Sequence, residues 1–149
     1  MGSKEILEEE RKLSFKEFNH EDALKIGLMI IDRVRREKLR RIGVRILLGD
    51  LLVFQYLMDE KNEDIWLKRK QNTVEKIGHS SYYVYLKNEE ENIYSELMDN
   101  DFYAVCGGGF PIIINGKNEG VMCVSGLTHD MDNMLITDAL KEYRRERVK

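Results

Sequence analysis

The chain has 149 residues, and it is poor in proline and cysteine. One proline and an ordinary 42% hydrophobic share exclude a disordered tail and allow a full hydrophobic core. Cys106 and Cys123 are the only two cysteines, and their apolar surroundings predict reduced, buried thiols. The sequence leaves open whether the two cysteines form a disulfide, although no feature of the expected fold requires one.

Long apolar runs and an excess of positive charge are also missing. No stretch approaches the ~20 apolar residues that a membrane-spanning helix needs, and residues 1–6 contain no apolar signal core. The 24 basic residues stand against 27 acidic ones, giving a net charge of −3. We therefore expect a cytoplasmic protein that binds neither nucleic acid nor a membrane.

Helices are predicted from apolar residues that recur every three or four positions. Asn19 is a favourable N-cap for the first, which ends near Glu37 with arginines in its last turn. Asn62 can cap the second, and Ser80 or Ser81 the third, which is either a helix or a turn-rich segment. The predicted ranges are 19–37, 62–77, 80–92 and 130–145.

Two hairpins are predicted from alternating apolar residues and turn dipeptides. Gly49–Asp50 separates the strands of the first, and Asn115–Gly116 lies in the loop of the second. Because hairpins form antiparallel pairs, we expect an α+β fold with an antiparallel sheet and helices on both faces. The predicted strands are 42–48, 52–58, 112–114 and 121–125.

No linker or internal repeat divides the chain. Residues 1–18 are expected to be a helical lead-in, since 5–12 are charged and have helical propensity. Residues 19–149 are expected to form one domain, because the length suits one hydrophobic core.

Lys70 is the first candidate site residue. At ~100° per residue it falls on one stripe with Trp66, Val74 and Ile77. An ammonium within an apolar stripe must reach solvent, pair with an acid or meet an anionic ligand. Solvation or a salt bridge is the simpler interpretation, and ligand contact is the alternative.

Gly107, Gly108 and Gly109 are the second candidate. Three glycines can aim successive amides at one anion, but tight turns into strands use the same residues. Neither the P-loop nor the dinucleotide-binding pattern is present.

The histidines show no spacing typical of a zinc site. His79 and His129 have polar neighbours in sequence, and either is a candidate ligand for haem iron or a metal. Ser80 or Ser81 as a nucleophile would need a base, for which adjacent His79 gives no support, so N-capping is the better interpretation. Whether the protein is an enzyme stays open, because no nucleophile–base pair or carboxylate pair is recognised.

Several of these segments together resemble the haem-degrading/haem-binding protein family that includes GlcG and HbpS, in particular its small uncharacterised-protein branch. The resemblance covers roughly residues 20–145. It implies a profilin-like α/β/α sandwich with a five-stranded antiparallel sheet, so that residues 19–149 would be a GlcG/HbpS-like domain. It also implies a homo-oligomer built from dimers. The segments that carry it are Trp66, Arg69–Lys70, Asn72–Val74, Ser80–Ser81, Gly108–Ile112 and Val124–Leu127.

Function carries over less directly, because some relatives bind haem and are linked to its breakdown, whereas GlcG is named from a glycolate-utilisation operon. Such relatives usually have an Asp-His pair where this chain has Asp132–Asn133, with His129 four residues before Asn133. The favoured hypothesis is an oligomer that binds a small anion, a carboxylate or a tetrapyrrole. Haem binding or degradation is one alternative, and a protein-interaction module is the other. The polar ligand contacts are assigned to Lys70, Asn72, Ser80, Ser81 and Gly107–Gly109.

Overall fold

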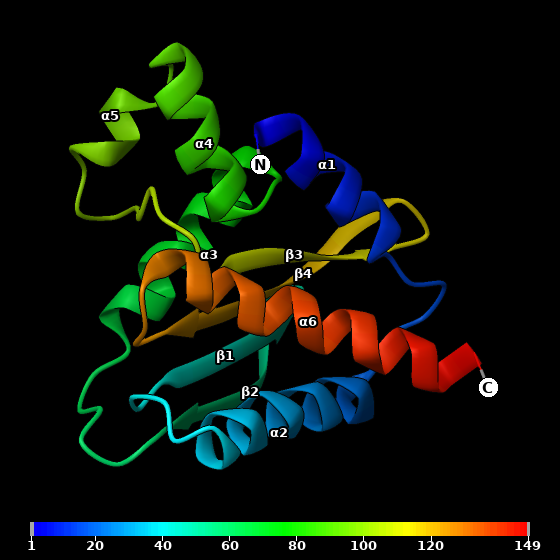
Figure 1. Cartoon of the computed structure of the whole chain (residues 1–149). Helices are drawn as coiled ribbons and strands as arrows, with labels where there is room; N and C mark the ends of the chain where they lie inside the picture. The colour runs from blue at the N-terminus through cyan, green and yellow to red at the C-terminus, as the bar shows by residue number, and fades with distance from the viewer. Residues whose placement is uncertain (1, 149) are drawn as a thin grey trace.

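Two β-hairpins form the sheet in the computed structural model, which describes residues 2–148 (Figure 1). Gly49 has a φ of 58° in the first turn, and Asn115 and Gly116 have φ values of 50° and 78° in the second. Positive φ at both central positions is the turn geometry that Asn-Gly favours. All pairs are antiparallel, in the order β2-β1-β4-β3. The strands are β1 (Gly43–Leu48), β2 (Leu51–Leu57), β3 (Gly109–Ile114) and β4 (Lys117–Ser125).

The sheet has four strands, which corrects the five implied by the family resemblance. The position beside β3 is occupied only at Phe15, which forms an isolated parallel bridge with Ile114. Phe15 N donates to Ile113 O at 2.8 Å, and Asn115 N donates to Phe15 O at 2.9 Å. Between the helix that ends at Lys12 and the one that begins at His20, no second bridge to β3 is formed among the described residues, so this segment is not a fifth strand.

One face of the sheet is covered by α2 (His20–Arg36) and α6 (His129–Val148), which hold the main core. Asn19 caps α2 as predicted, because its side chain accepts from Asp22 N. Alternate strand residues point into this core, where burying each large apolar side chain contributes about 1.5–3 kcal/mol. Its fully buried members include Ile26, Ile46, Phe110, Met122, Ile136 and Leu140.

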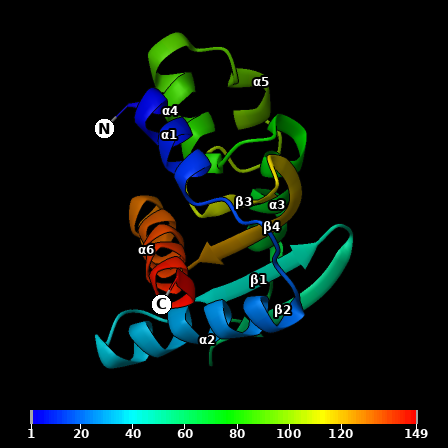
Figure 2. The ribbon, with the colours of Figure 1, turned by 90° about the vertical axis from the view of Figure 1, so that its right-hand side faces the viewer.

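The other face is covered by α3 (Ile65–Ile77), so helices lie on both faces as predicted (Figure 2). Leu67 and Val74 of α3 pack against Val121 and Cys123 of β4. The helix begins at Ile65, with Asp64 at its N-cap position, and not near Asn62 as predicted. A turn precedes it, in which Lys61 N donates to Met58 O at 2.9 Å.

Three further helices lie beyond the β3 edge of the sheet, with α1 alongside α4 (Figure 1). Ser3 on α1 donates to the Glu90 carboxylate through its amide and its hydroxyl, at 2.9 and 2.7 Å. Within residues 2–148, no helix combines the length and apolar character needed to cross a membrane. These helices are α1 (Ser3–Lys12), α4 (Ser81–Glu91) and α5 (Ser95–Met98).

Candidate functional site

Lys70 lies inside the molecule with its ammonium bonded to two acceptors. Its side chain is 3% exposed, and Nζ donates to Val124 O at 2.9 Å and to Asp132 Oδ2 at 3.0 Å. An unpaired buried ammonium would cost several kcal/mol, which is why a carboxylate faces it. The salt bridge is therefore present, and contact with a ligand stays a prediction that would require this pair to open.

Asp132 joins the ion pair to the connection between β4 and α6. It accepts from Leu127 N at 2.9 Å and Gly126 N at 3.4 Å. Burial raises the pKa of the Asp132 carboxyl, and Lys70 together with the two amides acts in the opposite direction. This group of contacts holds the chain where the sheet ends, and a structural role explains all of it.

The glycine turn directs its amides at side chains of this same chain. Gly107 N donates to His129 Nδ1 at 3.0 Å, and Gly109 N donates to Ser81 Oγ at 2.8 Å. Gly108 has a φ of 122°, and a Cβ there would lie 2.5 Å from Lys70 Nζ. The turn thus brings Lys70, Ser81 and the three glycines together, with two of the three amides already bonded within the chain.

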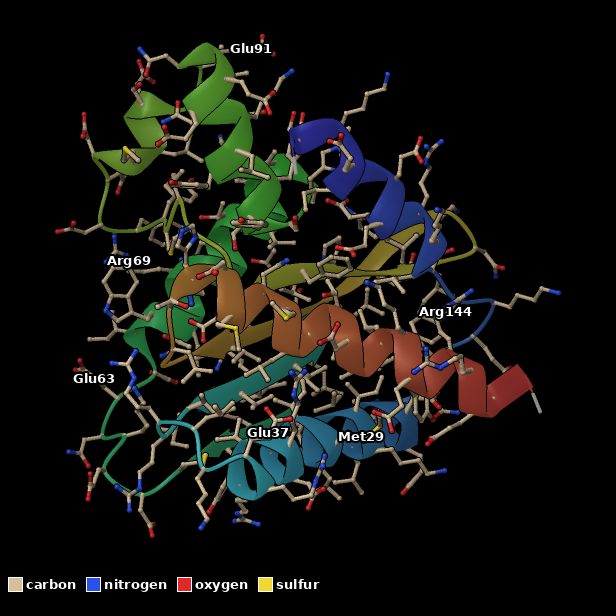
Figure 3. All side chains as sticks on the ribbon, in the orientation of Figure 1. Met29, Glu37, Glu63, Arg69, Glu91 and Arg144 are labelled. Atoms are coloured by element: carbon tan, nitrogen blue, oxygen red, sulfur yellow. The ribbon has the colours of Figure 1, made fainter. Side chains whose placement is uncertain are left out.

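Ser80 and Asn72 lie on either side of this turn and hold neighbouring segments. Ser80 caps α4 as predicted, since its hydroxyl accepts from Tyr83 N at 3.1 Å. Asn72 Nδ2 donates to Phe102 O at 2.9 Å, and Arg69 Nε donates to Tyr103 O at the same distance. Figure 3 labels Arg69, whose guanidinium lies 4.0 Å above the Trp66 ring. These contacts hold the segment before the glycine turn against α3.

His129 has its Nδ1 occupied as an acceptor. Because Nδ1 accepts from Gly107, the ring proton of the neutral imidazole lies on Nε2. The ring is edge-on to Tyr82 and Tyr85, with centroids 5.4 and 4.5 Å away. Iron bound at Nε2 needs the proton on Nδ1, so ligation by His129 would break the Gly107 hydrogen bond.

His79 differs from His129 in what its Nδ1 contacts, which is a carboxylate and not a backbone amide. Its Nδ1 lies 2.9 Å from Glu10 Oε1, and its side chain is 42% exposed. The hydrogen bond to Glu10 raises the pKa of His79, against a smaller opposing effect of burial. None of the described residues bonds to Nε2, which leaves that nitrogen available for a ligand.

Glu10 reaches His79 from α1 and is itself almost fully buried. Its other oxygen accepts from Ser80 N at 3.0 Å, so both carboxylate oxygens have donors. Sequence reasoning missed this residue, although a signal was present. Ile6, Glu10 and Leu13 share one face of α1, and all three are buried. An acid within an apolar stripe predicts a partner for the same reason that Lys70 does.

A groove of about 810 Å³ opens beside this pair. It lies between α1 and the end of the β3–β4 hairpin, and its lining includes His79, Leu7, Arg11, Ile113 and Asn118. A volume of this size is within the range of about 300–1,000 Å³ that small-molecule and cofactor sites occupy. The groove combines apolar side chains, two cations, an imidazole and two acids, and one of these acids, Glu8, pairs with Arg11 at 3.3 Å.

The two cysteines are free, and burial is the main cause that raises the pKa of each. For fully buried Cys123 the pKa rises to about 12, so both residues favour the neutral thiol. Across residues 2–148, no three histidine, cysteine or acidic side chains come together as a metal-binding group.

Comparison with known proteins gives one family and several relatives. The family described as haem degrading protein HbpS-like matches residues 18–141. A protein of Psychromonas ingrahamii named UPF0303 protein is 32% identical over 144 residues, covering 93% of this chain and 90% of that protein.

Solved structures share the fold. The Ybr137w protein superposes with a TM-score of 0.89 at 21% identity, over all of this chain and 91% of that one. A PduOC–haem complex superposes with a TM-score of 0.67 at 14% identity, over 83% of this chain and 93% of that one. At these identities the two structures establish the common architecture.

Proposed function

This chain belongs to the haem degrading protein HbpS-like family, and from that premise we propose that it binds haem in the groove beside α1, with His79 as the axial ligand. The observation that carries the proposal is the pairing of His79 Nδ1 with Glu10 at 2.9 Å in that groove. The solved PduOC–haem complex, which shares the fold, gives the proposal further support.

Glu10 prepares His79 for this role. When Nδ1 donates its proton to a carboxylate, Nε2 keeps its lone pair and the ring becomes a stronger base toward iron. Glu10 is fixed by Ser80 N as well, so the ring is held in one orientation. Bound haem would supply a redox-active iron, and the chain would supply the axial nitrogen and its orientation.

The groove offers the remaining contacts that a tetrapyrrole needs. Leu7 and Ile113 provide apolar surface, and Lys4 and Arg11 place two cations at the same opening. Haem carries carboxylate side chains, which cations of this kind bind through charge-assisted hydrogen bonds. The hypothesis of a small anionic ligand and the haem hypothesis thereby become one, with His79 and not Lys70 as its centre.

The test is a haemin titration of the purified protein, followed by the Soret absorption band. We expect one saturable site per chain, lost in His79→Ala and weakened in Glu10→Gln. His129→Ala is the matched control, because it also removes an imidazole but leaves the groove intact.

Three results would overturn the assignment. A Soret shift that never saturates would exclude a defined haem site. Saturable binding that survives in His79→Ala but is lost in His129→Ala would move the ligand to the other histidine. If haemin has no effect while one protein partner is captured stoichiometrically, the interaction-module alternative is favoured.

We also propose a homo-oligomer built from dimers. Its support is the edge strand β2, where Leu51, Leu52 and Tyr56 are 56%, 42% and 38% exposed. An edge strand has unpaired backbone groups, and apolar side chains there favour pairing with a second chain. Sedimentation as a monomer at all concentrations would contradict this proposal.

A further inference from the structure

A second groove, of about 720 Å³, lies at the end of α2 and shares no lining residue with the groove at His79. Its walls are the loop from α2 to β1 and the segment that follows β2. Five basic side chains line it and only one acid, Glu60. The basic residues are Arg35, Lys38, Arg40, Arg41 and Lys61. Such a concentration of positive charge is unexpected in a chain whose net charge is −3.

Three acids near this groove in sequence already have cationic partners. Asp32 pairs with Arg36 at 2.8 Å, and Glu37, labelled in Figure 3, pairs with Arg33 at 3.1 Å. Glu60 pairs with Arg41 at 2.8 Å. Among the described residues, no acid lies within 4 Å of the other four cations. Their mutual repulsion is therefore not offset by the protein itself.

The dipole of α2 explains only part of this charge. Cations stabilise the last turn of a helix, which accounts for Arg35. Arg40, Arg41 and Lys61 lie beyond that turn, where the effect of the dipole has fallen off. Arg41 is paired with Glu60, so Arg40 and Lys61 are the two without a carboxylate partner among the described residues.

Another basic groove in the molecule differs in what its cations contact. It lies beside Phe15, and its two arginines are Arg144 and Arg147. Arg144 donates to Ser14 O, and Arg147 donates to Glu17 O and lies 3.8 Å from the carboxylates of Glu17 and Asp22. Both arginines there have acceptors within the protein, whereas in the groove at the end of α2 only Arg41, among the described residues, has a carboxylate partner.

The backbone around the α2 groove is held in place. A Cβ at Gly126, whose φ is 148°, would lie 2.4 Å from Arg41 O, so the loop packs directly on this glycine. Met58 N donates to Ile42 O at 3.0 Å, and Leu39 N donates to Val34 O at the same distance. The cations therefore project from a fixed frame, and Leu39 and Met58 add apolar surface to the groove.

We propose that this groove binds a multiply charged small anion through Arg35, Arg40 and Lys38. Guanidinium groups pair with phosphate and carboxylate oxygens in the same forked geometry, so the shared chemistry is that of a polyphosphate or a polycarboxylate. The loop backbone that carries these charges needs no further ordering, which lowers the cost of binding.

Calorimetric titration with tripolyphosphate and, separately, with citrate distinguishes the two sources. We expect one saturable site per chain for at least one of them, weakened by added salt. The double variant Arg35→Gln/Arg40→Gln should lower the association constant at least about tenfold, because two charge-assisted contacts are lost.

Arg36→Gln is the matched control. Arg36 belongs to the same turn of α2 and is exposed, but it does not line the groove and already pairs with Asp32. It should change the association constant less than about twofold. Thermal unfolding of all variants establishes that each is folded.

Three outcomes would overturn the proposal. The first is that neither anion shows saturable binding. The second is that Arg36→Gln weakens binding as much as the double variant, which would indicate general charge attraction. A DNA duplex that alone saturates the groove would assign it to nucleic acid instead.

Discussion

Two cation–carboxylate pairs lie near the same end of the fold, with nearly equal distances and opposite surroundings. Lys70 and Asp132 are 3.0 Å apart, and their side chains are 3% and 2% exposed. His79 and Glu10 are 2.9 Å apart, and theirs are 42% and 4% exposed. Distance alone does not separate a structural pair from one that can bind a ligand.

The hydrogen-bond partners of the other polar atoms distinguish the two pairs. Lys70 also donates to Val124 O, and Asp132 also accepts from the amides of Gly126 and Leu127. In the other pair, none of the described residues bonds to His79 Nε2. A pair whose atoms are bonded inside the protein serves the fold, whereas one with an accessible, unbonded nitrogen can serve a ligand.

Removing the buried cation should have the largest effect. Lys70→Ala leaves Asp132 without its counter-charge, and breaking such a buried pair costs about 3–5 kcal/mol. Denaturant unfolding measures this loss. Lys68→Ala is the control, because Lys68 lies on the same helix at 56% exposure and 3.5 Å from Asp64, and should cost less than about 0.5 kcal/mol.

A neutral double replacement sharpens the same point. Lys70→Met with Asp132→Asn removes both charges, keeps an acceptor for the two amides, and should recover part of the lost stability. If Lys70→Ala unfolds no more easily than Lys68→Ala, the buried pair does not stabilise the fold.

The sequence predicted the elements whose signals are local. Asn19 caps α2 through a contact three residues away, and the turn dipeptides at Gly49 and Asn115 set both hairpins. The predicted number of strands, five, was wrong; it came from the family resemblance and not from the residues themselves. Beside β3, the segment between α1 and the cap at Asn19 forms one bridge, at Phe15, and not a strand.

The site depends on pairings that no local pattern contains. Glu10 and His79 are 69 positions apart, and Lys70 and Asp132 are 62 apart. The apolar stripe of α3 predicted that Lys70 needs a partner, but not which acid supplies it. The same pattern in α1, with Glu10 between Ile6 and Leu13, was the missing signal for the groove.

The smallest expected effect on stability concerns His79 and pH. Glu10 raises the pKa of His79 above 6.5, so the charged pair stabilises the fold fully below pH 6.5. This contribution is lost as pH rises through the raised pKa. Because His79 is 42% exposed, solvent screening limits it to less than about 1 kcal/mol. The difference in melting temperature between wild type and His79→Ala should shrink accordingly as the pH rises.

Haem affinity should move in the opposite direction over the same pH range. A proton on Nε2 competes with iron, so affinity rises as His79 loses its charge. Haemin titrations at several pH values, compared with the melting curves, measure both trends on one residue. If haem affinity instead falls as the pH rises, as the stability contribution of the His79–Glu10 pair does, the imidazolium and not the neutral ring contacts the ligand. Ligation of the iron by His79 would then be wrong.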